Sequence, residues 1–168
     1  MRIGERHSLT LLLLAVVCLQ GCGGHDRLPS SGSTKSSLKE PRSADTLGPE
    51  GAVAVIRRYY EAIQARELPQ AYRLWAGEGD ASGQTFEDFE AGFAETSSVS
   101  VETGAPGRIE GAAGSRYIEV PVHITATTRD GRVQHFQGTY VLRRSVVDGA
   151  SEEQRAWHIH SAELRKLK

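Results

Sequence analysis

Four histidines in the second half of the chain are the side chains best suited to acid–base or metal chemistry. His123 and His135 are expected on the outer face of two neighbouring strands, and His158 and His160 form a His-x-His motif on a later strand. Two histidines at this spacing lie on one face of a strand and can both bind a metal ion. The sequence places no Asp or third His to complete such a site. We interpret all four as surface or interface histidines, and predict no metal site and no cofactor.

A second group of residues capable of acid–base chemistry lies at the start of a predicted helix, directly after Thr85. It consists of Glu87, Asp88 and Glu90. Thr is a favoured N-cap residue, and acids are stabilised by the positive end of the helix dipole. The helix start therefore accounts for these acids without catalysis. We predict no catalytic residue among them or elsewhere in the chain.

The N-terminus carries the most specific motif, Leu19-Gln20-Gly21-Cys22, at the end of an apolar run that begins at Leu9. Arg2 and Arg6 precede the run, which is too short to span a membrane but has the layout of a secretory signal. An ordinary secretory signal that happens to contain a cysteine is one interpretation. Such a signal prefers a small residue where Leu19 stands, three positions before the cut.

The same motif resembles the lipobox of bacterial lipoprotein signals, with an aliphatic residue three positions before a cysteine and a small residue directly before it. The resemblance implies cleavage between Gly21 and Cys22 and a diacylglycerol on the Cys22 thiol, with palmitate-type acyl chains that hold the protein on a membrane. Gly23 stands where Asp would favour inner-membrane retention. The resemblance therefore implies the outer membrane, with the protein facing the periplasm.

Composition divides the chain into three parts: a lipoprotein signal peptide at 1–21, the lipidated cysteine with a disordered linker at 22–49, and one folded domain at 50–168. The linker is rich in Gly, Ser and Pro and has no apolar period. Cys18 and Cys22 are the two cysteines of the chain, so the mature domain has no disulfide and no cysteine zinc site. A net charge of −1 without a basic stripe argues against a nucleic-acid partner.

Helical periodicity opens the folded domain. Apolar residues recur at i, i+3 and i+4 over Gly51–Arg66 and predict a first helix. A shorter helix is expected over Pro69–Ala76 and a third over Phe86–Glu95, whose aromatic stripe we interpret as core.

The period changes to two after Ser97 and predicts four strands. The first begins at Val99, is interrupted at 104–107 and resumes at 108–111; two long strands follow at Arg116–Thr128 and Val133–Arg144. After a charged loop at 145–155, a last strand begins at Trp157 and ends near Glu163, leaving a basic tail.

The loop between the two long strands decides which side chains face inward. A two-residue Asp130-Gly131 loop would pair an apolar face with a polar one. A three-residue loop, Arg129-Asp130-Gly131 with a left-handed Gly131, brings the apolar faces together. It pairs Ile118 with Leu142, Val120 with Tyr140, Val122 with Gly138, and Ile124 with Phe136. We predict the three-residue loop.

This order of elements resembles the nuclear transport factor 2-like superfamily, which includes ketosteroid isomerase and polyketide cyclases. The residues that carry the resemblance are Ile56-Arg57-Arg58-Tyr59-Tyr60-Glu61-Ala62-Ile63, Ala71-Tyr72-Arg73-Leu74-Trp75, Phe86 with Phe89, and Trp157-His158-Ile159. The resemblance implies an α+β fold in which three N-terminal helices pack on a curved, cone-shaped, four-stranded antiparallel meander sheet. It also implies a cavity between helices and sheet, which in enzymes of the superfamily holds an inward Asp, His or Tyr.

The predicted inward strand face has no carboxylate and no histidine. Its polar groups are hydroxyls and indoles, which cannot alone serve as a general base. We therefore expect a non-enzymatic envelope lipoprotein whose domain binds a protein partner or a second copy of itself. The alternatives are a domain that binds a small apolar ligand in the cone and, third, an isomerase- or dehydratase-like enzyme.

Two residue sets follow from these hypotheses. A cavity would be lined by aromatic residues that include one of the neighbours Tyr59 and Tyr60, and we choose Tyr60 with Tyr72, Trp75, Tyr140 and Trp157. A protein interface would use the mixed, mildly apolar outer sheet face, at Tyr117, His123, His135, Thr139 and Val141.

Overall fold

The computed structural model describes residues 45–168. The predicted signal peptide, with Gly21 and the lipidation site Cys22, and the predicted linker as far as residue 44 lie outside the described residues. From residue 45 onward, no helix is long and apolar enough to cross a membrane.

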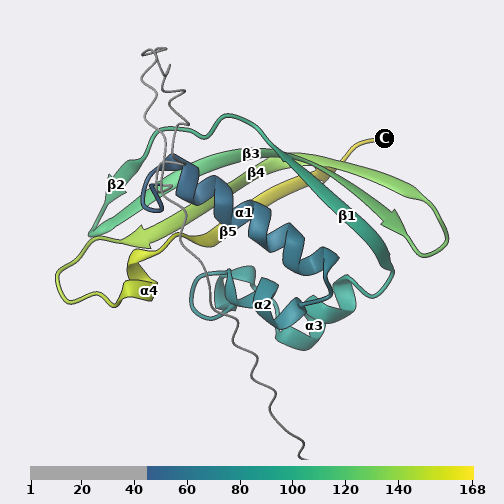
Figure 1. Cartoon of the computed structure of the whole chain (residues 1–168), viewed down its shortest axis with the longest axis horizontal. Helices are drawn as coiled ribbons and strands as arrows, with labels where there is room; N and C mark the ends of the chain where they lie inside the picture. The colour runs from purple at the N-terminus through teal and green to yellow at the C-terminus, as the bar shows by residue number, and fades with distance from the viewer. Residues whose placement is uncertain (1–44) are drawn as a thin grey trace, which may run out of the picture. The chain divides into compact units, whose positions relative to one another are not determined.

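Helices and strands follow the expected order and confirm the α+β class. The elements are α1 (Pro49–Gln64), α2 (Leu68–Arg73), η1 (Asp80–Ser82), α3 (Phe86–Gly92), β1 (Thr96–Thr103), β2 (Glu110–Ala112), β3 (Ser115–Thr128), β4 (Val133–Ser145), α4 (Glu152–Arg155) and β5 (His158–Lys166). The strands form a curved antiparallel sheet, and α1, α2 and α3 lie on one side of it (Figure 1). The core lies between these helices and the sheet.

Helix α1 is the main element packed on the sheet. Its inward stripe is buried and consists of Gly51, Ala52, Val53, Ile56, Tyr59, Tyr60, Ala62 and Ile63. The helix begins two residues earlier than predicted because Pro49 occupies its first turn, where a fixed φ and a missing N–H are tolerated. The turn before it is also ordered, since the Asp45 carboxylate accepts hydrogen bonds from the Leu47 and Gly48 N–H groups.

The carbonyls of Leu47 and Gly48 in turn accept hydrogen bonds from the indole N–H of Trp157, which lies more than 100 residues later in the sequence. Residues 45–49 therefore belong to the folded domain.

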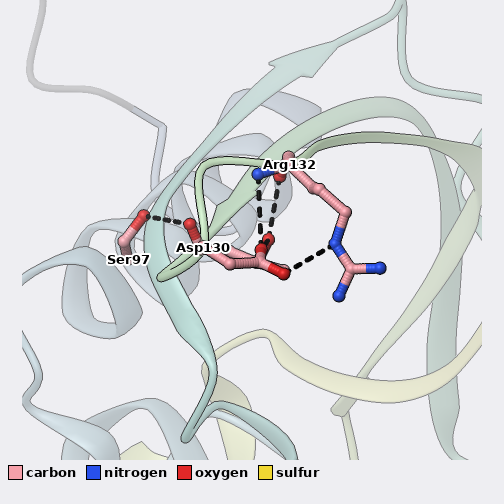
Figure 2. Close-up of polar contacts among 4 residues, drawn as sticks. Ser97, Asp130 and Arg132 are labelled. Carbon is pink, nitrogen blue, oxygen red and sulfur yellow. Dashed lines mark hydrogen bonds and ion pairs between the residues drawn. The ribbon is translucent and has the colours of Figure 1, made fainter.

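The long hairpin confirms the predicted register. Ile118 pairs with Leu142, Val120 with Tyr140, Val122 with Gly138, and Ile124 with Phe136. The loop is Arg129-Asp130-Gly131, with Gly131 at φ 83°. Figure 2 shows how this end is fixed: Asp130 pairs with the Arg132 guanidinium at 2.8 Å and accepts from the Arg132 backbone N–H, and Ser97 donates to a backbone carbonyl of the hairpin end.

The sheet has five strands rather than the four predicted. The interruption at 104–107 divides the first strand into β1 and β2, and both pair with β3, so the sheet order is β1-β3-β4-β5 with β2 beside β3. The predicted basic tail is also partly wrong, because β5 continues to Lys166 and pairs with β4 as far as Phe136.

The shorter helices differ most from expectation. Helix α2 ends at Arg73 and α3 at Gly92, each three residues earlier than predicted. Thr85 caps α3 as predicted, by accepting a hydrogen bond from the Asp88 N–H. Helix α4 lies inside the segment predicted to be a loop, where Ser151 and Gln154 form a capping box.

Candidate functional site

A cluster of aromatic side chains fills the space between α1, the end of α2 and the sheet, and we call it the interior cluster. It consists of Tyr59 and Tyr60 from α1, Trp75 from the segment after α2, Phe89 from α3 and Tyr140 from β4, each at most 8% exposed. The ring centroids of Tyr59 lie 5.1 to 6.3 Å from those of the other four. These edge-to-face and tilted contacts are the favoured geometries for aromatic pairs.

Two elements fix the cluster in place. Tyr140 faces inward because the register of the hairpin puts it on the apolar side, opposite Val120. Trp75 is held by a short backbone bridge in which the Ile159 N–H donates to the Leu74 carbonyl and the Ala76 N–H donates to the Ile159 carbonyl. The bridge ties the end of α2 to β5.

The hydroxyls of the cluster stay protonated in the folded chain. The Tyr60 and Tyr140 hydroxyl oxygens lie 2.7 Å apart in a buried hydrogen bond. Burial raises the pKa of Tyr59, of Tyr60 and of Tyr140 well above the usual value of 10. These groups can donate and accept hydrogen bonds at neutral pH, but they cannot act as anionic bases.

The Trp75 indole differs from the hydrogen-bonded pair of Tyr60 and Tyr140. Its Nε1–H is buried and has no hydrogen-bond acceptor among the described residues. Burial raises the pKa of the Tyr59 hydroxyl, and the nearby Trp75 indole acts in the opposite direction, but the two groups do not have hydrogen-bond geometry. A buried donor without an acceptor costs about 1–3 kcal/mol of free energy. A ligand oxygen atom that accepts a hydrogen bond from this N–H would recover part of that free energy.

The predicted cavity residues separate into two groups. Tyr60, Trp75 and Tyr140 come together in the interior cluster, whereas Tyr72 is half-buried against Phe86 and Phe89 and donates to the Gln84 carbonyl. Trp157 lies apart from the cluster, with its indole N–H bonded to the turn before α1. Tyr59 was left out of the predicted set, although its place in the apolar period of α1 already marked it as inward.

Side chains, rather than an open cavity, occupy the middle of the cone. Of the three best-formed pockets on the described part of the chain, none is lined by Tyr60, Trp75 or Tyr140. A ligand in the interior cluster would have to move at least one ring.

The outer sheet face carries the residues predicted for a protein interface. His123 and His135 are exposed, and Tyr117, Thr139 and Val141 are partly exposed. His135 lies 3.2 Å from the Thr125 hydroxyl and Tyr117 packs edge-on against His160. Across residues 45–168, no group of three or more His, Cys, Asp or Glu side chains is arranged to hold a metal ion.

Comparisons with known proteins agree with the fold. No protein-family model matches the chain, and no curated protein sequence matches it. Among solved structures, a candidate aromatic ring hydroxylase from Novosphingobium aromaticivorans is similar, with 15% identity over 71% of this chain and 90% of its own, at a TM-score of 0.51. A nuclear transport factor 2-like superfamily protein from Salmonella enterica serovar Typhimurium gives 16% identity, 71% and 90% coverage, and a TM-score of 0.50. The domain thus has the nuclear transport factor 2-like fold.

These neighbours correct the main functional prediction. The sequence led us to expect a non-enzymatic domain that binds a protein partner or itself, whereas a similar solved structure is described as a candidate enzyme that acts on an aromatic ring. The inference from the missing inward acid was too strong, because this fold carries many unrelated functions. The alternative, a domain that binds a small ligand, agrees better with the comparisons.

Proposed function

We propose that the chain is a membrane-anchored lipoprotein whose domain binds a small, largely apolar ligand at the interior cluster. The observation that carries the proposal is the buried Trp75 N–H without an acceptor, among the three tyrosine hydroxyls. Aromatic walls favour an aromatic ligand, because ring pairs gain about 0.5–1.5 kcal/mol beyond the area they bury. The unused donor favours a ligand with one acceptor oxygen, such as a carbonyl.

Access would come from the side of α2 and α3. Helix α1 buries eight residues, whereas α2 buries only Leu68 and Ala71, and α3 only Phe89. Because little apolar surface holds these two short helices, they can move outward at lower cost than α1. Phe89 and the half-buried Tyr72 would move with them and admit the ligand.

A matched pair of probes tests the ligand. The probes are 2-acetylnaphthalene and 2-ethylnaphthalene, which have similar shapes but differ in one carbonyl oxygen, titrated by calorimetry into residues 45–168. The carbonyl probe should bind up to about tenfold tighter, as expected from one hydrogen bond of about 0.5–1.5 kcal/mol. Equal affinities, or no binding by either probe, would overturn the proposal.

Two tryptophan variants locate the donor. Trp75→Phe should remove the preference for the carbonyl probe. Trp157→Phe should leave it, because the Trp157 N–H already bonds to Leu47 and Gly48. A preference that survives Trp75→Phe would place the ligand elsewhere.

The anchor is tested separately, on the full chain expressed in a bacterium and fed radiolabelled palmitate. The wild type and Cys18→Ser should both take up label, and Cys22→Ser should not. Fractionation should then find the labelled chain with the outer membrane, as the motif ending at Cys22 implies. Equal labelling of all three chains would refute lipidation at Cys22.

A further inference from the structure

A pocket with four charged residues in its wall lies at the end of the sheet near α4, and we call it the charged pocket. Figure 1 shows where α4 lies beside the sheet. The volume of the pocket is ≈ 490 Å³, within the range of about 300–1,000 Å³ typical of small-molecule sites. Three separate segments line it: 76–78 after α2, 143–147 at the end of β4, and 151–158 around α4. None of these residues belongs to the interior cluster.

Opposite charges line the charged pocket without pairing to one another. Arg143 and Arg144 supply two guanidinium groups, and Glu78 and Glu153 supply two carboxylates. Within residues 45–168 the ion pair of Asp130 with Arg132 is the only one at 4.0 Å or less. The two cations and the two anions therefore stand apart around the pocket.

Each arginine is positioned by a contact other than an ion pair. Arg144 lies over the Trp157 ring with 5.2 Å between the guanidinium carbon and the ring centroid, and its Nε is buried without an acceptor. Arg143 donates through Nε to the Ser115 hydroxyl at 3.1 Å. Both side chains are thus held without a carboxylate partner, which leaves their charge to a ligand.

The other polar groups of the pocket wall are already satisfied by their neighbours. Ser151 and Gln154 bond to each other in the capping box of α4. The His158 Nδ1 lies 3.2 Å from the Ala156 carbonyl, so Nδ1 donates there. These bonds fix part of the wall, and the groups left to recognise a ligand are the four charged side chains and the Nε2 of His158.

We propose that the charged pocket binds a small zwitterion of amino-acid or short-peptide size. Arg143 and Arg144 follow one another in β4, so their side chains leave opposite faces of the sheet. The ligand carboxylate would lie against Arg144, whose buried Nε has no acceptor, and the ligand ammonium group against Glu78 and Glu153. A simple anion would give no partner to the two carboxylates, and a simple cation would give none to the arginines. A ligand with both charges offers a partner to the cations and to the anions of the pocket.

Blocked peptides test the two charges one at a time. The full chain in detergent micelles is titrated by calorimetry at neutral pH with L-alanyl-L-alanine, its N-acetyl derivative and its C-terminal amide. The free dipeptide should bind about tenfold tighter than either blocked form, a difference of ~1.4 kcal/mol. L-Alanine, titrated in parallel, shows whether one residue suffices.

Charge-removing variants assign the two ends. Glu153→Gln should weaken binding of the free dipeptide but not of the N-acetyl form, and Arg144→Gln should weaken the free dipeptide but not the amide. Glu152→Gln and Arg58→Gln are the controls, because both residues are exposed and neither lines the charged pocket. The proposal is overturned if a blocked peptide binds as tightly as the free one, if the controls weaken binding equally, or if no probe gives heat at millimolar concentration.

Discussion

The interior cluster and the charged pocket use opposite physical means within one domain. The interior cluster is neutral, closed and held by ring contacts and one hydrogen bond between tyrosines. The charged pocket is open, and its four charged side chains are unpaired with one another. Burying a polar group is costly unless it forms a hydrogen bond inside the protein. A charge next to solvent is hydrated, so it can remain without a protein partner until a ligand binds.

This difference predicts that stability resides in the interior cluster and that the charged pocket contributes little to it. Each region also contains one unsatisfied donor, Trp75 Nε1 and Arg144 Nε. Since the great majority of buried polar atoms in native proteins find a partner, both exceptions call for an explanation. The two ligands proposed above provide one for each region.

The largest effect is expected from Tyr140→Ala. Removing the ring opens a cavity against Tyr59, Tyr60 and Trp75, and such truncations cost about 3–5 kcal/mol. Urea unfolding followed by circular dichroism measures the loss. The matched change in the charged pocket, Arg143→Gln, removes one hydrogen bond to Ser115 and should cost no more than about 1.5 kcal/mol. Equal losses would remove the distinction between the two regions.

A second effect is expected at alkaline pH. Because burial raises the pKa of Tyr59, Tyr60 and Tyr140 above 10, the unfolded chain loses these protons first. The contribution of these protonated tyrosines to the free energy of unfolding is therefore present below pH 10 and is lost as the pH rises above 10. Each tyrosine can lower the free energy of unfolding by up to ~1.4 kcal/mol for each pH unit.

Phenolate absorbance and circular dichroism, followed together, test this. The signal of three tyrosines should appear only with unfolding. Ionisation of all the tyrosines in the folded chain would show that the cluster is open to solvent.

The sequence predicts more of the interior cluster than of the charged pocket, for a physical reason. The inward face of the hairpin follows from alternation and one loop length, so Tyr140 could be placed opposite Val120 before the structure was known. The period of α1 likewise marks its buried stripe. Local patterns of this kind predict faces, but they do not predict how completely the facing side chains fill the space between them.

The charged pocket leaves no such local signal. The pocket takes Glu78, Arg144 and Glu153 from separate segments of the chain. Glu78 also has a positive φ of 56°, which the sequence does not predict. Helix α4 was missed because its four residues are too few for an apolar period. Pockets built from the ends of several elements depend on tertiary packing, which periodicity does not encode.

A third, smaller effect is expected from deleting one hydroxyl. Tyr140→Phe leaves the Tyr60 hydroxyl without its buried partner and should cost about 1–2 kcal/mol. Adding Tyr60→Phe should recover part of this loss, since removing both partners leaves nothing unsatisfied. A double-mutant cycle by urea unfolding measures the coupling. Strict additivity of the two changes would mean that the hydroxyls do not depend on each other.

The smallest effect is expected from Arg144→Gln in the charged pocket. The change removes a cation over the Trp157 ring, worth about 0.5–1 kcal/mol at exposed sites, but it also removes the buried Nε that lacks an acceptor. These contributions oppose each other, so thermal unfolding should show a net change below about 1 kcal/mol. Arg144→Lys keeps the charge and should behave like the wild type within the same limit. A loss as large as that of Tyr140→Ala would mean that Arg144 is part of the core, and the charge at this end of the sheet would then serve the fold rather than a ligand.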